Sequence, residues 1–279
     1  PLEARLLEDA RSAVRDGMRA GAHGLSTGLS YYPNSFSTTD ELVALCEVVA
    51  AEDGVYVTHI RDHENDRAFG GGGITEAIEI ARRSGVKLHI SHYRTWAHNA
   101  GHPEQILDEI DSAKAAGIDI TMETYPYPVG STFPMYFLPA PFHDGGPDAI
   151  LARLEDPAEH AHWAAYLDLE GGRELANGIW TYVGGAASHL QGVTFAEEIA
   201  RRGVSLGTMV LDVMRESRLA CGFRNVPPGP RVHRQIDADI MYLLRRPDYM
   251  VGSDAIPVGD LPPPRAWGTF PRIAGRLRR

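Results

Sequence analysis

The feature that most constrains the fold of this chain is a regular alternation of strand-like and helix-like segments through its first half. Apolar strand-like runs at 55–60, 86–92 and 118–127 are separated by helix-like stretches at 74–85 and 102–117. Strands joined through a helix usually pair in parallel, and their runs are apolar on both faces where helices cover the sheet. The alternation therefore predicts a parallel α/β fold, either a (β/α) barrel or a doubly wound sheet.

The alternation breaks in the middle of the chain and then resumes. We predict that residues 1–134 form the central βα units of a barrel and that 135–178 is a helical insertion. Residues 179–279 are predicted to form a C-terminal barrel portion, which includes the last strand at 249–254.

Composition and charge limit the class of partner. The chain has 279 residues and a formal charge of −10, which would repel nucleic acid. It has no apolar run near the roughly 18 residues that would span a bilayer. Cys46 and Cys221 lack a CxxC partner, so we interpret them as free thiols of a cytoplasmic protein. We expect a small-molecule substrate, and neither nucleic acid nor a membrane as partner.

Polar residues close several predicted strands, in the sequences THIR (58–61), SHYR (91–94), ETYPY (123–127) and GSD (252–254). In parallel α/β folds the carboxyl ends of the strands converge on one edge, where functional groups gather. Two imidazoles from neighbouring strand ends can bind one zinc ion at about 2.0 to 2.1 Å. A carboxylate there can bind the ion or act as a base beside it. By position alone, histidines that are hydrogen-bonded in a core remain an alternative.

Six motifs in order carry a resemblance to a known family: GAHGLSTGLSYYP, THIR, SHYR, ETYPYPVGST, GSD and GTFPRIAG. This series resembles the D-aminoacylases, the N-acyl-D-amino-acid amidohydrolases of the amidohydrolase superfamily. The resemblance implies a TIM-type (β/α) barrel of the metal-dependent hydrolase type. It also implies zinc-dependent hydrolysis of the amide bond of N-acyl-D-amino acids.

The same resemblance implies roles for individual residues. His59 and His92 match the histidines that hold the tightly bound zinc, and Asp254 matches the aspartate that acts as general base and then as general acid. Tyr31, Tyr125 and Ser131 match residues that orient the substrate and its carboxylate. Arg94 stands where the family usually has a lysine with that role. The planar guanidinium of arginine binds a carboxylate with two parallel hydrogen bonds, whereas the ammonium group of lysine binds it as a compact point charge.

The chain also departs from the family pattern. It lacks the HxH pair of the first barrel strand and the cysteine-containing turn that supplies a further zinc ligand, and Pro264 replaces a histidine in the last motif. About five of eight barrel strands are recognisable. We therefore expect a partial barrel, a central and C-terminal fragment of a longer protein, which by itself binds zinc weakly and has little deacylase activity.

Three other functions remain open at this point. A non-catalytic fragment or degenerate scaffold of the same family fits the missing ligands. A cyclic amidase, similar to hydantoinases or dihydroorotases, usually needs a carboxylated lysine between two metals, and no lysine stands at a strand end. Gly24–Gly28 spells the G-x-S-x-G elbow of serine hydrolases around Ser26, but Pro33 follows instead of a helix and no histidine follows Asp254.

Two further features have no assigned role. Arg61 either holds a carboxylate or braces an acidic neighbour in a surface loop, such as Asp62 or Glu64. The glycine-rich segment FGGGGI (69–74) lacks the GK[ST] of a phosphate-binding loop, and we interpret it as a mobile loop.

Overall fold

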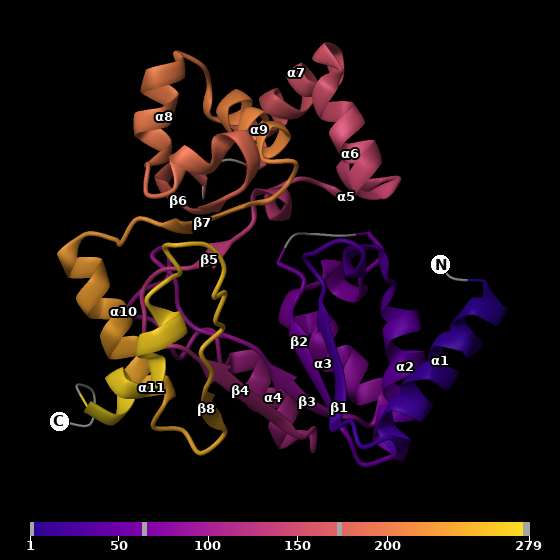
Figure 1. The fold of residues 1–279 in the computed structure, drawn as a ribbon. Coiled ribbons are helices and arrows are strands. Elements are labelled where there is room, and N and C mark those ends of the chain that lie inside the picture. Colours follow the sequence, from indigo (N-terminus) through magenta and orange to yellow (C-terminus); the bar gives the residue numbers. More distant parts are fainter. Residues whose placement is uncertain (1–2, 63–65, 172–174, 276–279) are drawn as a thin grey trace. The chain divides into compact units, whose positions relative to one another are not determined.

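The computed structural model describes residues 3–62, 66–171 and 175–275, and Glu64 lies outside them. The chain forms two compact units (Figure 1). The first unit comprises residues up to 126 together with 234–253, and the second comprises 127–233 together with the residues from 254 onward. Both units therefore combine segments that are distant in the sequence. The three domain ranges expected from the sequence remain a prediction.

The first unit contains a five-stranded parallel sheet. Its strands, in spatial order, are β1 (Gly24–Gly28), β2 (Val55–His59), β3 (Lys87–Ile90), β4 (Ile120–Thr124) and β8 (Tyr249–Val251). Every neighbouring pair is parallel. This arrangement confirms the predicted α/β fold with a partial, barrel-like parallel sheet.

Helices separate these strands along the chain: α1 (Ala4–Arg19), α2 (Thr39–Ala51), α3 (Gly73–Ser84), α4 (Asp108–Ala115) and α10 (Pro230–Leu243). Local sequence sets their ends. The Thr38 side chain and Glu41 form a capping box at the start of α2, and Gly85 ends α3 in the left-handed conformation.

One face of the sheet packs on the core of the first unit. Tyr56, Leu88 and Met122 point from β2, β3 and β4 into this core, where Ile80 of α3 is fully buried. Because side chains alternate along a strand, His59 lies on the opposite face from Tyr56. The apolar face thus holds the strands in register, and their polar ends lie at one edge of the sheet.

The second unit contains a three-stranded antiparallel sheet in the order β5 (Ser131–Thr132), β7 (Cys221–Asn225) and β6 (Gly178–Val183). Its core includes Trp180, Phe195 and Phe223, with ring centroids 4.5 Å apart for Trp180–Phe195 and 5.2 Å apart for Phe195–Phe223. Its helices are α5 (Ala140–His143), α6 (Gly146–Glu155), α7 (Pro157–Tyr166), α8 (Phe195–Arg202), α9 (Leu206–Glu216) and α11 (Arg265–Gly275).

Strand β6 differs from the expectation that the parallel alternation resumes after the insertion. It pairs antiparallel with β7, and Trp180 lies opposite Phe223. The partner strand CGFRN is short and contains a glycine, so its own sequence carries little strand signal. Pairing partners are decided by side-chain packing across the sheet, which local periodicity does not contain.

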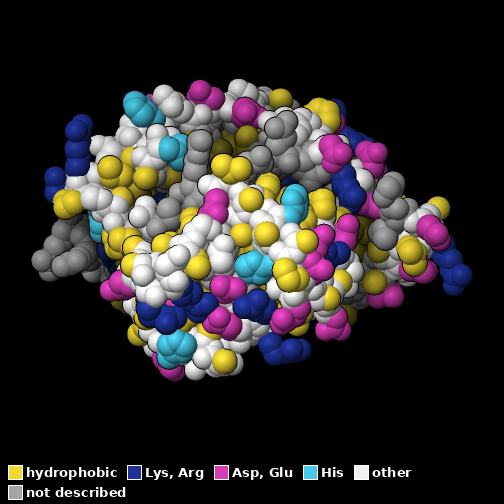
Figure 2. All heavy atoms as spheres, turned by 90° about the horizontal axis from the view of Figure 1, so that it is seen from above, with side chains coloured by type: hydrophobic (Ala, Val, Ile, Leu, Met, Phe, Trp, Pro, Cys, Tyr) yellow, Lys and Arg dark blue, Asp and Glu magenta, His cyan; other side chains and the backbone are white. Residues whose placement is uncertain are grey.

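The described helices include none that is both long and apolar enough to cross a bilayer. On the face shown in Figure 2, acidic side chains lie among lysine, arginine and apolar side chains. Acidic and basic side chains are therefore interspersed on this face.

The two cysteines give a test of the cores. Cys46 and Cys221 are free and buried, and burial raises the pKa of each thiol to about 12. Because the thiolate is the reactive form, we expect a thiol reagent such as DTNB to label neither cysteine in the native chain at pH 8 and both in denaturant. The variants C46S and C221S assign the signals. Rapid labelling of the native chain would contradict this description of the cores.

Candidate metal centre and substrate-binding residues

Two histidines from neighbouring strands meet at the edge of the parallel sheet. His59 is the last residue of β2, and His92 follows the end of β3. Nδ1 of His59 and Nε2 of His92 share a hydrogen bond of 2.8 Å, and the ring centroids are 4.6 Å apart. His92 has a φ of 42°, which a non-glycine residue rarely adopts. Such outliers cluster at functional sites.

Tyr31 joins this pair from the end of β1. Its ring centroid lies 4.9 Å from that of His59. A Cβ atom on Gly28 would lie only 3.0 Å from Cδ2 of Tyr31, so the glycine allows the tyrosine ring to fold back over the strand end. The structure therefore brings together Tyr31, His59 and His92, three of the residues that the sequence singled out.

Asp62 contacts the other side of the His59 ring. Its Oδ2 atom lies 2.7 Å from Nε2 of His59. A carboxylate behind the far nitrogen of a histidine is the arrangement that orients metal-binding histidines and selects their tautomer. The sequence analysis considered Asp62 only as a neighbour of Arg61.

The histidine pair fits a divalent metal in part. Tetrahedral zinc bound by two imidazoles at about 2.0 to 2.1 Å separates the two nitrogens by about 3.3 Å, so the rings need to open by about half an ångström. Within the described ranges, however, no group of three or more His, Cys, Asp or Glu side chains is arranged so that it could hold a metal ion. The described residues thus offer two imidazole ligands to a metal.

A second pair of predicted residues lies beside the end of β4. The guanidinium carbon of Arg94 is 3.9 Å from the ring centroid of Trp96 and 5.0 Å from that of Tyr125. Nη1 of Arg94 donates a hydrogen bond to the carbonyl oxygen of Thr95 at 3.0 Å. Nε and Nη2 are buried, and neither has a hydrogen-bond partner among the described residues.

This arrangement leaves one edge of a buried cation unsatisfied. Arg94 is only 2% exposed, and a buried charge without a partner is costly. The free edge, formed by Nε and Nη2, matches the two oxygens of a carboxylate. Arg94 and Tyr125 are thus brought together as a candidate anion site. Trp96 was not singled out from the sequence.

Asp239 of α10 holds the loop that carries Arg94. Its Oδ2 accepts hydrogen bonds from the Thr95 hydroxyl at 2.8 Å and from the Gly101 N–H at 2.7 Å, and its Oδ1 accepts one from Gln235 at 3.2 Å. Nothing in the local sequence indicates this role, because Asp239 is more than a hundred residues from its loop partners.

Asp254 and Ser131 belong to the second unit. Asp254 has a φ of 44°. Its Oδ2 atom lies 2.8 Å from Nη2 of Arg265, the first residue of α11. The same Nη2 donates to the carbonyl oxygen of Ser131 at 3.2 Å. The Ser131 hydroxyl donates to the carbonyl oxygen of Phe223 at 2.9 Å. Arg265, which the sequence analysis assigned no role, therefore connects Asp254 with Ser131.

Comparison with known proteins shows what the chain as a whole is similar to. No protein-family model matches the chain. The chain is 28% identical to a D-aminoacylase of Alcaligenes xylosoxydans xylosoxydans over 270 residues, which cover 96% of the chain and 46% of the relative. It is 29% identical to an N-acyl-D-glutamate deacylase of the same organism over 269 residues, which cover 95% of the chain and 45% of the relative.

The solved structures agree. A crystal structure of D-aminoacylase, said to define a novel subset of amidohydrolases, matches with a TM-score of 0.71 at 25% identity, over 100% of this chain and 48% of that one. The chain is similar to the D-aminoacylases. An N-acyl-D-glutamate deacylase from Bordetella bronchiseptica, complexed with zinc and a phosphonate inhibitor, has the same fold with a TM-score of 0.71 at 24% identity, over 99% of this chain and 48% of that one.

These comparisons confirm the resemblance to the D-aminoacylases that the six motifs predicted. The chain spans about half the length of the curated relatives it matches. The comparisons do not test the roles of individual residues, so the assignments for His59, His92, Asp254 and the four substrate-binding residues remain predictions.

Replacement of the buried carboxylate of Asp239 tests the support of the Arg94 loop. In D239N the amide presents an N–H₂ group toward donors, so at least one of the hydrogen bonds from Thr95, Gly101 or Gln235 is lost. We expect a loss of about 1 to 3 kcal/mol in the free energy of unfolding, measured by urea denaturation. The matched variant D9N changes an exposed aspartate of α1 and is expected to stay within about 0.5 kcal/mol of wild type. Equal stability of the two variants would contradict the assigned role.

Proposed function

We propose that this chain carries part of the active site of a zinc-dependent hydrolase that deacylates N-acyl-D-amino acids. The observation that carries the proposal is the approach of the His59 and His92 nitrogens to 2.8 Å at the ends of adjacent parallel strands. The names of the curated relatives, D-aminoacylase and N-acyl-D-glutamate deacylase, support the substrate class. The zinc and phosphonate complex of a protein with the same fold supports the choice of metal.

In this proposal His59 binds zinc through Nδ1 and His92 through Nε2, the two atoms that face each other. When bound, zinc supplies a water of lowered pKa and polarises the acyl carbonyl group. Asp254 accepts the proton of the attacking water and returns it to the amine nitrogen, which leaves poorly as an anion. The guanidinium of Arg265 pairs with the carboxylate of Asp254 and holds it in place for this step.

The substrate carboxylate is proposed to bind at the free edge of Arg94. Two parallel hydrogen bonds from Nε and Nη2 fix the plane of the carboxylate, and the rings of Trp96 and Tyr125 hold the guanidinium in place. Tyr31 borders the histidine pair and orients the substrate there. Ser131 has the least direct part, because its hydroxyl hydrogen already bonds to the carbonyl of Phe223.

One observation favours a second candidate, a non-catalytic scaffold related to the D-aminoacylases. A catalytic zinc site usually has three protein ligands, and the described residues bring together only two imidazoles. In that case the histidine pair binds metal weakly and the chain performs no chemistry alone.

A zinc titration of the chain by calorimetry tests the metal site. We expect one zinc ion to bind weakly to wild type and not detectably to H59A or H92A, because each variant leaves a single imidazole. H98A is the matched control, since His98 is an exposed histidine in the loop that follows His92. Zinc binding that survives the loss of both His59 and His92 would overturn the proposed centre.

Hydrolysis of N-acetyl-D-amino acids, followed by release of the free amine, tests the chemistry. We expect the 279-residue chain with zinc to hydrolyse these substrates at a low rate, and a chelator to abolish this activity. We expect zinc-loaded D254N to be about 10² to 10⁴-fold slower than the zinc-loaded wild type, at unchanged zinc affinity. Activity that persists after chelation, or that prefers L-substrates, would contradict the proposed function. A chain that binds zinc through both histidines and shows no hydrolysis supports the scaffold instead.

A further inference from the structure

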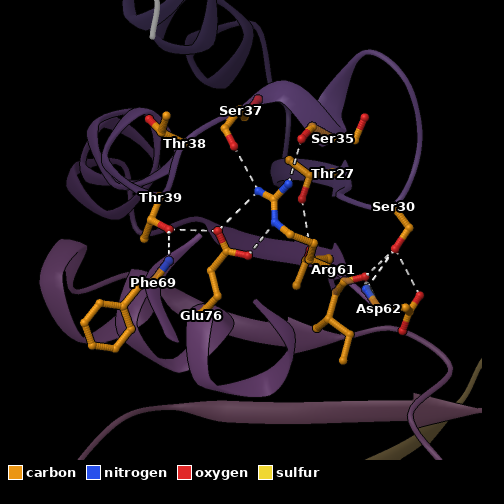
Figure 3. A network of polar contacts seen from close by, with 12 residues as sticks. Thr27, Ser30, Ser35, Ser37, Thr38, Thr39, Arg61, Asp62, Phe69 and Glu76 are labelled. Carbon is orange, nitrogen blue, oxygen red and sulfur yellow. Dashed lines mark hydrogen bonds and ion pairs between the residues drawn. The ribbon is translucent and has the colours of Figure 1, made fainter. Parts of the chain in front are cut away.

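We propose that Arg61 and Glu76 are positioning residues, which hold His59 and Tyr31 in the arrangement that the candidate metal centre requires. This inference rests on the proposed function. Arg61 and the glycine-rich segment 69–74 were both conspicuous in the sequence without a role, and the structure joins them in one buried network (Figure 3).

Arg61 uses its whole guanidinium group to tie the end of β2 to two other segments. Nη1 donates to the carbonyl oxygen of Ser35 at 2.8 Å, and Nη2 donates to that of Ser37 at 2.9 Å. Nε donates to Oε2 of Glu76 at 2.9 Å. Figure 3 shows the guanidinium between these groups. Both carbonyls belong to the segment that follows Tyr31, so Arg61 fixes this segment against β2.

Glu76 is the counter-ion within α3, and its side chain is fully buried. Its Oε1 accepts hydrogen bonds from the Thr39 hydroxyl at 2.8 Å and from Nη2 of Arg61 at 3.3 Å. Thr39 in turn accepts a hydrogen bond from the N–H of Phe69 at 2.8 Å. The ion pair is thus connected to the first residue of α2 and to the start of the glycine-rich segment.

The glycine-rich segment folds around the Arg61 side chain. Gly72 has a φ of 113°, and a Cβ atom there would lie 3.1 Å from Cδ and 3.2 Å from Cβ of Arg61. The N–H of Gly73 donates to the carbonyl oxygen of Arg61 at 2.9 Å. Glycine is needed here both for the backbone conformation and for the close approach. The segment therefore has a structural role around Arg61.

The residues on either side of Arg61 reach the candidate metal centre. His59 lies two positions before it, and Asp62, directly after it, contacts Nε2 of His59. The N–H of Asp62 also donates to the Ser30 hydroxyl at 3.0 Å, next to Tyr31. Figure 3 shows Ser30 and Asp62 beside each other. Fixing Arg61 therefore fixes the backbone from which His59 and Asp62 project, and also the segment that carries Tyr31.

The chemistry of the pair indicates positioning more than stabilisation. Burial of an ion pair costs desolvation that the attraction between its charges often fails to exceed, so such pairs are weak evidence for stability. Four hydrogen bonds from the Arg61 guanidinium to backbone and side-chain acceptors instead define one geometry. Lysine keeps the charge of Arg61 but not the planar fork, so R61K separates charge from geometry.

The test compares R61K with wild type in two measurements. The first is the imidazole NMR signals of His59 and His92 in the metal-free chain, assigned with H59A and H92A. The second is zinc affinity by calorimetry. We expect R61K to shift both imidazole signals and to weaken zinc binding about 10 to 100-fold, the usual effect of losing outer support of a metal ligand.

T39V is the second variant, in case R61K does not fold. It removes the hydroxyl that donates to Glu76 and accepts from the Phe69 N–H, in a side chain of similar shape, and we expect the same changes in smaller size. The matched control is E198Q in the second unit, because Glu198 is a buried carboxylate that pairs with Arg201 and Arg202. We expect E198Q to lower stability and to leave both imidazole signals and zinc affinity unchanged.

The outcomes separate this inference from the proposed function. Unshifted imidazole signals in folded R61K or T39V overturn the positioning role, whatever the chain does with zinc. Wild type that binds no zinc, with imidazole signals that still respond to R61K, overturns the metal centre and leaves the link between Arg61 and the histidines standing. Equal effects of R61K and E198Q on the signals would show a general loss of structure and also overturn the inference.

Discussion

The parallel pairing of β1, β2, β3, β4 and β8 is the constraint on which the rest of the first unit depends. In-register parallel strands end at the same edge of the sheet, so residues that are more than thirty positions apart in the sequence become neighbours. His59 and His92 meet for this reason. The apolar side chains on the other face hold the register, and a slip of one residue would turn His59 into the core.

The backbone at the strand ends does as much for the candidate site as the side chains do. His92 and Asp254 both have positive φ, although neither is a glycine. A strand that simply continued would direct these side chains by alternation. The turn to positive φ redirects His92 toward His59, and such a conformation persists only where the surrounding contacts hold it. Two backbone hydrogen bonds help to hold the chain at these turns. The Tyr93 N–H donates to the carbonyl of Glu123 at 2.9 Å, and the Gly252 N–H donates to the carbonyl of Thr124 at 3.1 Å.

Buried charges recur around the candidate residues, and each has a different environment. All three guanidinium nitrogens of Arg61 donate hydrogen bonds, to Glu76 and to two carbonyls, as expected of a residue that holds structure. Arg94 packs against two aromatic rings, and its Nε and Nη2 have no hydrogen-bond partner among the described residues. Arg265 shares its charge with Asp254. Three arginines of similar burial therefore differ in how their donors are occupied.

Local sequence alone determined the strands of the parallel sheet, the helices that separate them, and the positions of His59, His92 and Asp254 at or after strand ends, because periodicity and capping act over a few residues. The ordered motifs also determined the resemblance to the D-aminoacylases. Only the tertiary structure decided that β6 pairs antiparallel with β7, that Asp239 supports the Arg94 loop, and that Arg61 pairs with Glu76. These contacts join residues that are distant in the chain, and Arg61 pairs with Glu76 although Asp62 and Glu64 are nearer in the sequence. That choice depends on burial and on the direction of each side chain, which exist only once the chain has folded.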